Sequence, residues 1–117
     1  MEQTCDVIVV GAGGAGMTAA LAAAKHGLDT VVIEKSAYFG GSTARSGGGV
    51  WTPGNRALRK AGQVEADDAE QARTYLDSIV GDVVPKERRD TFLDRGPEVI
   101  DFLLDHTPVQ LKWVPEY

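Results

Sequence analysis

The sequence predicts an α/β fold in which a strand–helix–strand unit precedes a long glycine-rich loop and a helical segment. Two short β-branched runs, 5–10 and 30–34, flank an alanine-rich stretch, and ten of the fourteen glycines lie between positions 11 and 49. Such spacing makes a right-handed parallel βαβ crossover the default. Because two parallel strands do not form a self-sufficient sheet, we expect an incomplete sheet and the N-terminal part of a longer protein.

Composition indicates a single globular domain and excludes several classes of function. The chain has 117 residues, 43% hydrophobic and 25% charged, with a net charge of −5 and one cysteine. One cysteine excludes an internal disulfide framework and a cysteine-built metal cluster, and it fits a reducing, cytoplasmic compartment. Residues 1–60 have a charge balance of +2 and residues 61–117 one of −7, with no basic stripe carrying aromatics, so nucleic acid is not an expected partner.

The uncharged run from Val7 to Ala24 is long enough to raise the question of a membrane span. Eleven of its eighteen residues are glycine or alanine, so it has little hydrophobic drive to insert. Glu2 and Asp6 occupy the place of the basic region that a signal peptide needs. We therefore expect neither a transmembrane segment nor a signal peptide.

The first unit is expected over residues 5–34. The run 5–10 predicts a buried parallel strand, Ala15–His26 predicts a helix that ends at Gly27, and 30–34 predicts a second buried strand. Residues 36–55 show no periodicity and are expected to form one long loop.

A helical segment is expected over 56–106. It opens with a short helical turn at 55–61. Asp67 and Glu70 are predicted to form a capping box on a helix that ends at Gly81. A further helix, with Pro85 in its first turn, is expected to break near Gly96-Pro97 before a third over 98–105. Weak alternation over 109–114 predicts the start of another strand.

The chemistry of the chain is carried first by Gly11-x-Gly13-x-x-Gly16, which follows one strand and opens a helix. The first glycine allows the tight turn, the second leaves room for a pyrophosphate, and the third lets helix and strand pack closely. Phosphates then bind at the helix N-terminus. Glu34, at the end of the second strand, is placed to accept hydrogen bonds from ribose hydroxyls and disfavours NADP. The alternative is a Rossmann-like unit whose glycines serve only packing.

A second glycine-rich string, residues 40–49, favours a flavin over a plain nicotinamide cofactor. An isoalloxazine ring needs backbone donors and little side-chain bulk beside it, which Gly47 to Gly49 could supply. Ser42 or Thr43 could hydrogen-bond the phosphates or the flavin. The alternative is a flexible glycine linker, against which Trp51 and Pro53 argue.

With these strings in place, the chain resembles the 3-ketosteroid Δ1-dehydrogenases of the fumarate reductase/succinate dehydrogenase flavoprotein superfamily. The resemblance covers essentially all 117 residues. Residues 5–16 and 34–35 resemble motifs that are shared widely across the superfamily. Residues 42–51 and 81–97 point more narrowly to the steroid dehydrogenases. It implies non-covalently bound FAD, a 3-ketosteroid substrate dehydrogenated at C1–C2, and a separate electron acceptor.

The resemblance also implies which residues contact FAD. The family's contact positions match Gly11, Gly13, Gly16, Glu34, Lys35, Ser42, Thr43, Ala44, Gly47 and Gly48. The rest of the two strings is expected to take part in the same site: Ala12, Gly14, Ala15, Gly40, Gly41, Ser46 and Gly49.

Two departures limit what the resemblance implies. Relatives with covalent flavin carry histidine at the position of Ser42, and this chain has no histidine between His26 and His106. The catalytic tyrosines of the family are expected beyond the chain, and Tyr117 is not taken as one of them, so we expect no catalytic residue and no metal ligand here. The role of Arg45 stays open. So do two alternatives: another superfamily member, such as a Δ4-steroid dehydrogenase or a fumarate reductase-like enzyme, and a non-catalytic nucleotide-binding fragment.

Overall fold

A computed structural model describes residues 4–62 and 68–114. It divides into two compact units, one up to Val50 and one from Trp51 onward, which are described separately. Asp67 and Tyr117, both named in the sequence predictions, lie outside the described residues. Within the described part of the chain, no helix has the length and apolar character needed to cross a membrane.

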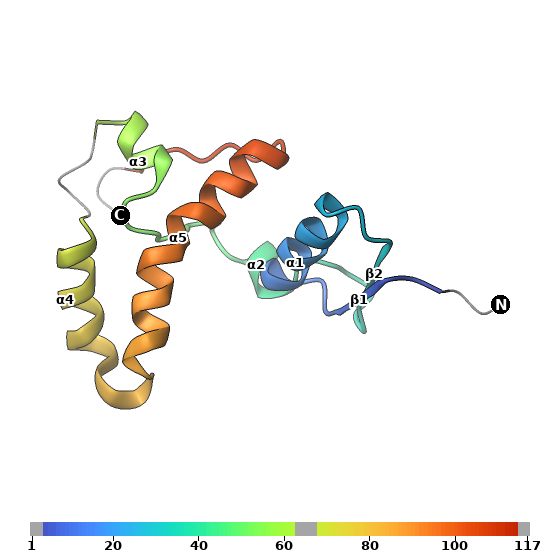
Figure 1. Ribbon diagram of the computed structural model, residues 1–117, viewed down its shortest axis with the longest axis horizontal. Coiled ribbons are helices and arrows are strands. Elements are labelled where there is room, and N and C mark those ends of the chain that lie inside the picture. The colour runs from blue at the N-terminus through green and yellow to red at the C-terminus, as the bar shows by residue number, and fades with distance from the viewer. Residues whose placement is uncertain (1–3, 63–67, 115–117) are drawn as a thin grey trace. The chain divides into compact units, whose positions relative to one another are not determined.

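The first unit is the predicted βαβ crossover. Strand β1 (Val7–Val10) and strand β2 (Thr30–Ile33) are parallel, with Val7 opposite Thr30 and Val10 opposite Ile33. Helix α1 (Gly14–Lys25) connects them and packs on the two-stranded sheet (Figure 1). Gly27, with φ of +80°, follows the helix and turns the chain toward β2.

The prediction that both strands are buried is wrong for the described residues. Val10 is 83% exposed, Ile8 58% and Ile33 49%. The sheet described here has two strands, and α1 is the one long helix of this unit, so much of the apolar strand surface has no cover. A β-branched run therefore predicted the strands correctly but not their burial.

The predicted loop over 36–55 contains a short helix, α2 (Gly41–Arg45), so the expectation of a wholly irregular loop is wrong. Gly40 adopts φ of +104°, and its carbonyl accepts a hydrogen bond from the Ala44 N–H at 3.1 Å, which closes the helical turn. Because the helix spans little more than one turn, it leaves no periodic pattern in the sequence.

The residues that follow the second glycine string are packed rather than linker-like. The Trp51 ring lies 5.7 Å from the Tyr75 ring and 5.9 Å from the Phe92 ring, measured between centroids. Thr52 and Asn55 are 6% and 8% exposed. The second unit therefore begins directly at Trp51.

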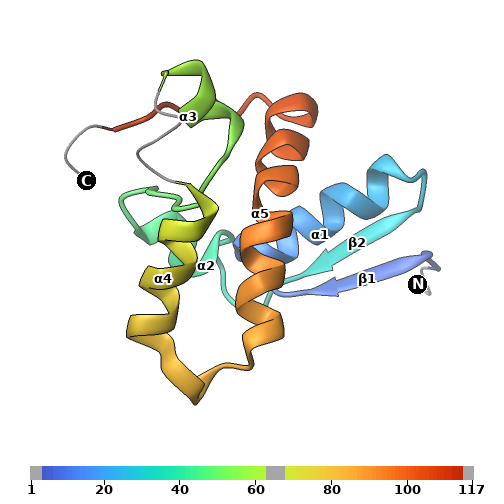
Figure 2. The same cartoon turned by 60° about the vertical axis from the view of Figure 1, so that its left-hand side comes forward.

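The described residues of the second unit form four helical elements. They are α3 (Arg56–Lys60), α4 (Ala69–Val80), the 3₁₀ turn η1 (Gly81–Val83) and α5 (Lys86–His106). Helices α4 and α5 run side by side, as both views show (Figures 1 and 2). Among the described residues of this unit, Pro53, Ala72, Leu93 and Ile100 are buried and apolar.

Helix α5 continues through Gly96-Pro97, so the predicted break there is wrong. Pro97 removes one backbone hydrogen bond, and the axis of α5 bends partway along (Figure 1). Leu93 and Ile100, each 4% exposed, anchor the helix to the core on both sides of the proline. A residue that precedes proline clashes with its ring through the Cβ atom, which Gly96 lacks. The burial of Leu93 and Ile100 thus stabilises a continuous helix by more than the lost hydrogen bond at Pro97 destabilises it.

Residues 109–114 form no strand, contrary to the weak alternation in the sequence. The described sheet consists of β1 and β2, and residues 109–114 are not part of it. Six residues that pair with no neighbouring strand have no ladder of hydrogen bonds to stabilise an extended conformation.

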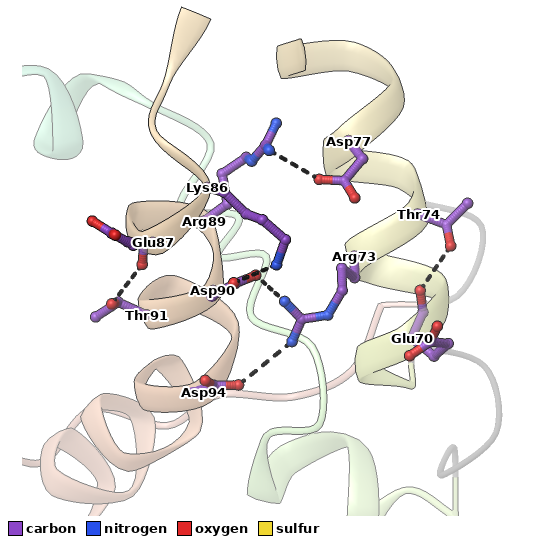
Figure 3. Close-up of polar contacts among 10 residues, drawn as sticks. All are labelled: Glu70, Arg73, Thr74, Asp77, Lys86, Glu87, Arg89, Asp90, Thr91 and Asp94. Carbon is purple, nitrogen blue, oxygen red and sulfur yellow. Dashed lines mark hydrogen bonds and ion pairs between the residues drawn. The ribbon is translucent and has the colours of Figure 1, made fainter. Parts of the chain in front are cut away.

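Ion pairs connect α4 to α5 (Figure 3). Arg73 pairs with Asp90, and the Arg89 guanidinium lies 3.2 Å from the Asp77 carboxylate. Arg89 also donates to the Gly81 carbonyl at the end of α4, and its side chain is 11% exposed. These pairs align two helices that share only a small apolar core.

Helix α4 is capped by Asp68, which yields a stability prediction. Its carboxylate accepts hydrogen bonds from the Glu70 N–H at 2.6 Å and the Gln71 N–H at 2.9 Å. Asp68→Ala removes the Oδ1 atom that accepts both hydrogen bonds, and it is expected to lower the free energy of unfolding in urea by about 1 kcal/mol. Asp68→Asn keeps an oxygen acceptor and is the control. Equal midpoints for all three proteins would contradict this cap.

Candidate cofactor-binding site

The first glycine segment forms a tight turn from β1 into α1. Gly11 has φ of +99°, and its N–H donates to the Ile33 carbonyl at 2.7 Å. A Cβ on Gly16 would lie 1.9 Å from the Gly11 carbonyl oxygen, so α1 can approach β1 this closely only with glycine there. Gly13 precedes the helix, and a Cβ at that position would meet no atom within 4 Å.

The N-terminal turn of α1 presents backbone donors beside this open space. Hydrogen bonding within the helix starts with the Met17 N–H, which donates to the Gly13 carbonyl at 2.9 Å. The N–H groups of Gly14, Ala15 and Gly16 come before it and have no acceptor inside the helix. Together with the helix dipole they favour an anionic group at this end.

Glu34 lies at the carboxyl end of β2, and its carboxylate reaches the turn that follows β1. Its Oε2 accepts a hydrogen bond from the Ala12 N–H at 2.8 Å, and its Oε1 accepts one from the Ser36 N–H at 2.9 Å. These bonds, the one from Ala12 foremost, lower the pKa of Glu34 below its ordinary value, and the adjacent Lys35 ammonium adds to the effect. The carboxylate is thus held ionised and oriented at the edge of the sheet.

The second glycine segment lies against the first. Gly40 pairs with Gly13 as a parallel bridge, and its N–H donates to the Ala12 carbonyl at 2.7 Å. A Cβ on Gly40 would lie 2.4 Å from the Ala44 side chain, and one on Gly41 would lie 3.3 Å from the Gly13 Cα. The Gly40–Ala12 hydrogen bond and the close approach of Gly41 to Gly13 therefore join the two segments, and glycine at position 40 leaves room for Ala44 within its own turn.

The end of the second segment is more open. The Ser46 hydroxyl donates to the Thr43 carbonyl at 2.8 Å and accepts from the Gly48 N–H at 3.1 Å, so it supports its own turn. Cβ atoms on Gly47 or Gly48 would meet nothing within 4 Å. Ser42, Arg45 and Gly49 are exposed.

The structure brings most of the predicted residues to one edge of the sheet. Both glycine segments and Glu34 lie at the carboxyl ends of β1 and β2, the usual ligand edge of a parallel sheet. The arrangement offers donors for an anion, a carboxylate for hydroxyl groups, and backbone without side chains where a ligand approaches. No group of three or more potential metal ligands occurs within residues 4–62 and 68–114.

Two contacts of the site are absent from the sequence predictions. One is the hydrogen bond from Ala12 to Glu34. The other is the approach of Thr43 to Gly14, where an added Cβ would lie 2.8 Å from the threonine hydroxyl oxygen. The spacing of 22 residues between Ala12 and Glu34 in the sequence could have indicated the hydrogen bond between them. The contact of Thr43 with Gly14 depends on α2, a helix that the sequence did not predict, so no sequence pattern indicates it.

Comparison with known proteins gives one family and several close relatives. The family model described as the FAD binding domain matches residues 6–116. A 3-oxosteroid 1-dehydrogenase of Mycolicibacterium smegmatis is 58% identical over 115 residues, which cover 98% of this chain and 20% of that protein. The chain spans about one fifth of the length of this relative and of two 3-oxosteroid 1-dehydrogenases of Mycobacterium tuberculosis.

Solved structures agree with the sequence matches. A 3-ketosteroid Δ1-dehydrogenase from Sterolibacterium denitrificans superposes with a TM-score of 0.76 at 36% identity, covering 89% of this chain and 18% of that one. A 3-ketosteroid Δ4-(5α)-dehydrogenase from Rhodococcus jostii RHA1 gives a TM-score of 0.74 at 32% identity, covering 86% and 21%. The first unit and the helices after it are thus known architecture.

The lowered pKa of Glu34 predicts a pH effect on stability. Because the folded-state pKa lies below the unfolded-state value near 4.5, its contribution is present above that value and is lost as pH falls through the folded-state pKa. Glu34→Gln should therefore lower the urea unfolding midpoint at neutral pH. In acid, the difference between the midpoints of the variant and the parent protein should become smaller. Glu87→Gln, at an exposed position in α5, is the control. A Glu34→Gln deficit that stays constant with pH would contradict this assignment.

Proposed function

Because this chain belongs to the FAD binding domain family, we propose that it forms the FAD-binding part of a flavin-dependent oxidoreductase that dehydrogenates 3-ketosteroids between C1 and C2. FAD is the cofactor of this family. The substrate assignment is supported by the 58% identity to a 3-oxosteroid 1-dehydrogenase across 98% of the chain. It is an assignment for the whole protein, of which this chain spans a part.

The residues of the first unit fit an FAD molecule. The open space at Gly13 lies beside the first-turn N–H groups of α1, so a diphosphate can approach the backbone donors without meeting a side chain. In this proposal Gly14 and Ala15 donate to the diphosphate, and the remaining lone pairs of Glu34 accept from ribose hydroxyls. Lys35 follows Glu34 at the same edge and belongs to the same site.

The second glycine segment completes the proposed site. Gly47, Gly48 and Gly49 leave the backbone accessible to the isoalloxazine ring, while Ser42 and Thr43 bring hydroxyl groups to the same segment. When bound, FAD supplies a two-electron acceptor for hydride. The residues of this chain bind and orient it. With serine at position 42, we propose that the attachment is non-covalent.

A Δ4-steroid dehydrogenase is the second candidate activity. It is favoured by the similarity to the 3-ketosteroid Δ4-(5α)-dehydrogenase, whose TM-score of 0.74 is close to that of the Δ1 enzyme. The two activities share the cofactor site and differ in which ring carbons react. The residues of this site therefore serve either activity equally.

The cofactor part of the proposal predicts the behaviour of Gly13→Ala. The backbone at Gly13 has φ of −78°, which alanine adopts readily, and the added Cβ meets no protein atom. Unfolding stability should therefore change by less than about 1 kcal/mol. Bound FAD, measured as flavin released into the supernatant by acid precipitation, should fall at least about tenfold, the equivalent of 1.4 kcal/mol.

The exposed helical substitution Thr91→Ala is the control for this measurement. Full retention of FAD by Gly13→Ala would contradict the proposed position of the diphosphate. Flavin that stays with the precipitated parent protein would contradict non-covalent attachment.

The substrate part is tested by turnover. The purified whole protein, rather than this chain alone, is given a saturated-ring-A 3-ketosteroid or a Δ4-3-ketosteroid with an artificial electron acceptor, and separately fumarate with a reduced donor. We expect a 1,2-unsaturated ketosteroid by mass spectrometry and NMR from both steroids. A 4,5-unsaturated product from the saturated steroid favours the Δ4 activity, and turnover of fumarate alone would reject both steroid activities.

A further inference from the structure

Helix α2 touches the first turn of α1 at one side chain. An ideal Cβ on Gly14 would lie 2.8 Å from the Thr43 Oγ1 atom, 3.5 Å from its Cγ2 and 3.6 Å from its Cβ. Thr43 is exposed, so this contact is no part of a hydrophobic core. The branched end of Thr43 therefore occupies the space that a side chain at position 14 would need.

Next to this contact, the two glycine segments also meet through their backbones. Gly40 donates to the Ala12 carbonyl at 2.7 Å and pairs with Gly13, and a Cβ on Gly41 would lie 3.3 Å from the Gly13 Cα. At these places the two segments meet as backbone. At Gly14 and Thr43, by contrast, a side chain fills the gap between them.

We propose that Thr43 is a positioning residue: its side chain, seated on Gly14, fixes the spacing between α2 and the first turn of α1 and so holds the two glycine segments in register for FAD. The inference rests on the proposed function for its ligand. It assigns to Gly14 a role that differs from that of Gly13, because a side chain at position 14 would meet protein and one at position 13 would meet only open space.

The physical consequence of a methyl group at position 14 is specific. At 2.8 Å from Oγ1 the methyl carbon overlaps the hydroxyl, so either Thr43 rotates about χ1 or α2 moves away. Threonine in a helix has few favoured χ1 rotamers, which limits the first escape. Without the side chain of Thr43 the overlap disappears, and alanine at position 14 should even help, since it favours helix more than glycine does.

A double-mutant cycle tests this pair. Gly14→Ala is made in the parent protein, in a Thr43→Ala background and in a Thr43→Val background. Urea unfolding is measured without FAD, and FAD affinity is measured by fluorescence titration of the apoprotein. In the parent, Gly14→Ala should lower the unfolding midpoint and weaken FAD binding about tenfold, a typical size for residues in contact.

The two Thr43 backgrounds distinguish an effect of the branched shape of the side chain from an effect of its hydroxyl group. Thr43→Val keeps the branched shape, so Gly14→Ala should retain its full effect there. In Thr43→Ala the same change should no longer lower the unfolding midpoint, and its effect on FAD affinity should be smaller than in the parent protein. Gly13→Ala is the matched control, and its loss of FAD should be the same in all three backgrounds.

Equal effects of Gly14→Ala in the parent and in Thr43→Ala would overturn the inference. Loss of the effect in Thr43→Val would also overturn it, because the hydroxyl rather than the shape would then be responsible. A parent protein that binds no FAD would instead contradict the proposed function, and the midpoints measured without FAD would still report whether positions 14 and 43 are coupled.

Discussion

The approach of α1 to the end of β1 is the constraint on which the first unit depends. A Cβ on Gly16 would come within 1.9 Å of the Gly11 carbonyl oxygen, far inside any allowed contact, so the helix lies where only glycine permits it. That position brings the first-turn N–H groups to the edge of the sheet, where Glu34 ends β2. A side chain at position 16 would lift the helix and carry the donors away with it.

The site is arranged mostly by backbone, with two side chains at decisive points. Glu34 bonds to the Ala12 N–H and so fixes the turn between the glycines of the first segment. Thr43 fills the gap between the two segments at Gly14. A carboxylate held ionised by backbone donors and a hydroxyl seated on a helix turn therefore frame an otherwise bare surface. This combination suits a ligand that alternates phosphate, hydroxyl and flat aromatic groups.

The sequence was sufficient to predict the βαβ unit because strand, helix and glycine signals agree over residues 5–34. It failed where tertiary packing decides. Pro97 predicted a break, yet Leu93 and Ile100 hold α5 to the core on both sides of it. Burial of the strands was predicted from composition, whereas it depends on neighbours outside the run itself. The helix α2 and the contact it makes at Gly14 could not be predicted, because one turn of helix carries no period.

The bond from Gly40 to Ala12 has a consequence for tolerance to sequence change. Ile33 is held by the ladder to β1, and Gly40 is held by its own bond to the Ala12 carbonyl, so both ends of the intervening segment are anchored to the same turn. Tyr38 and Phe39, 83% and 79% exposed, lie between these anchors and contribute little to them. Substitutions at Tyr38 and Phe39 are thereby uncoupled from the geometry of the glycines, and this exposed tip can diversify while the binding edge, with Glu34 as its carboxylate, stays fixed.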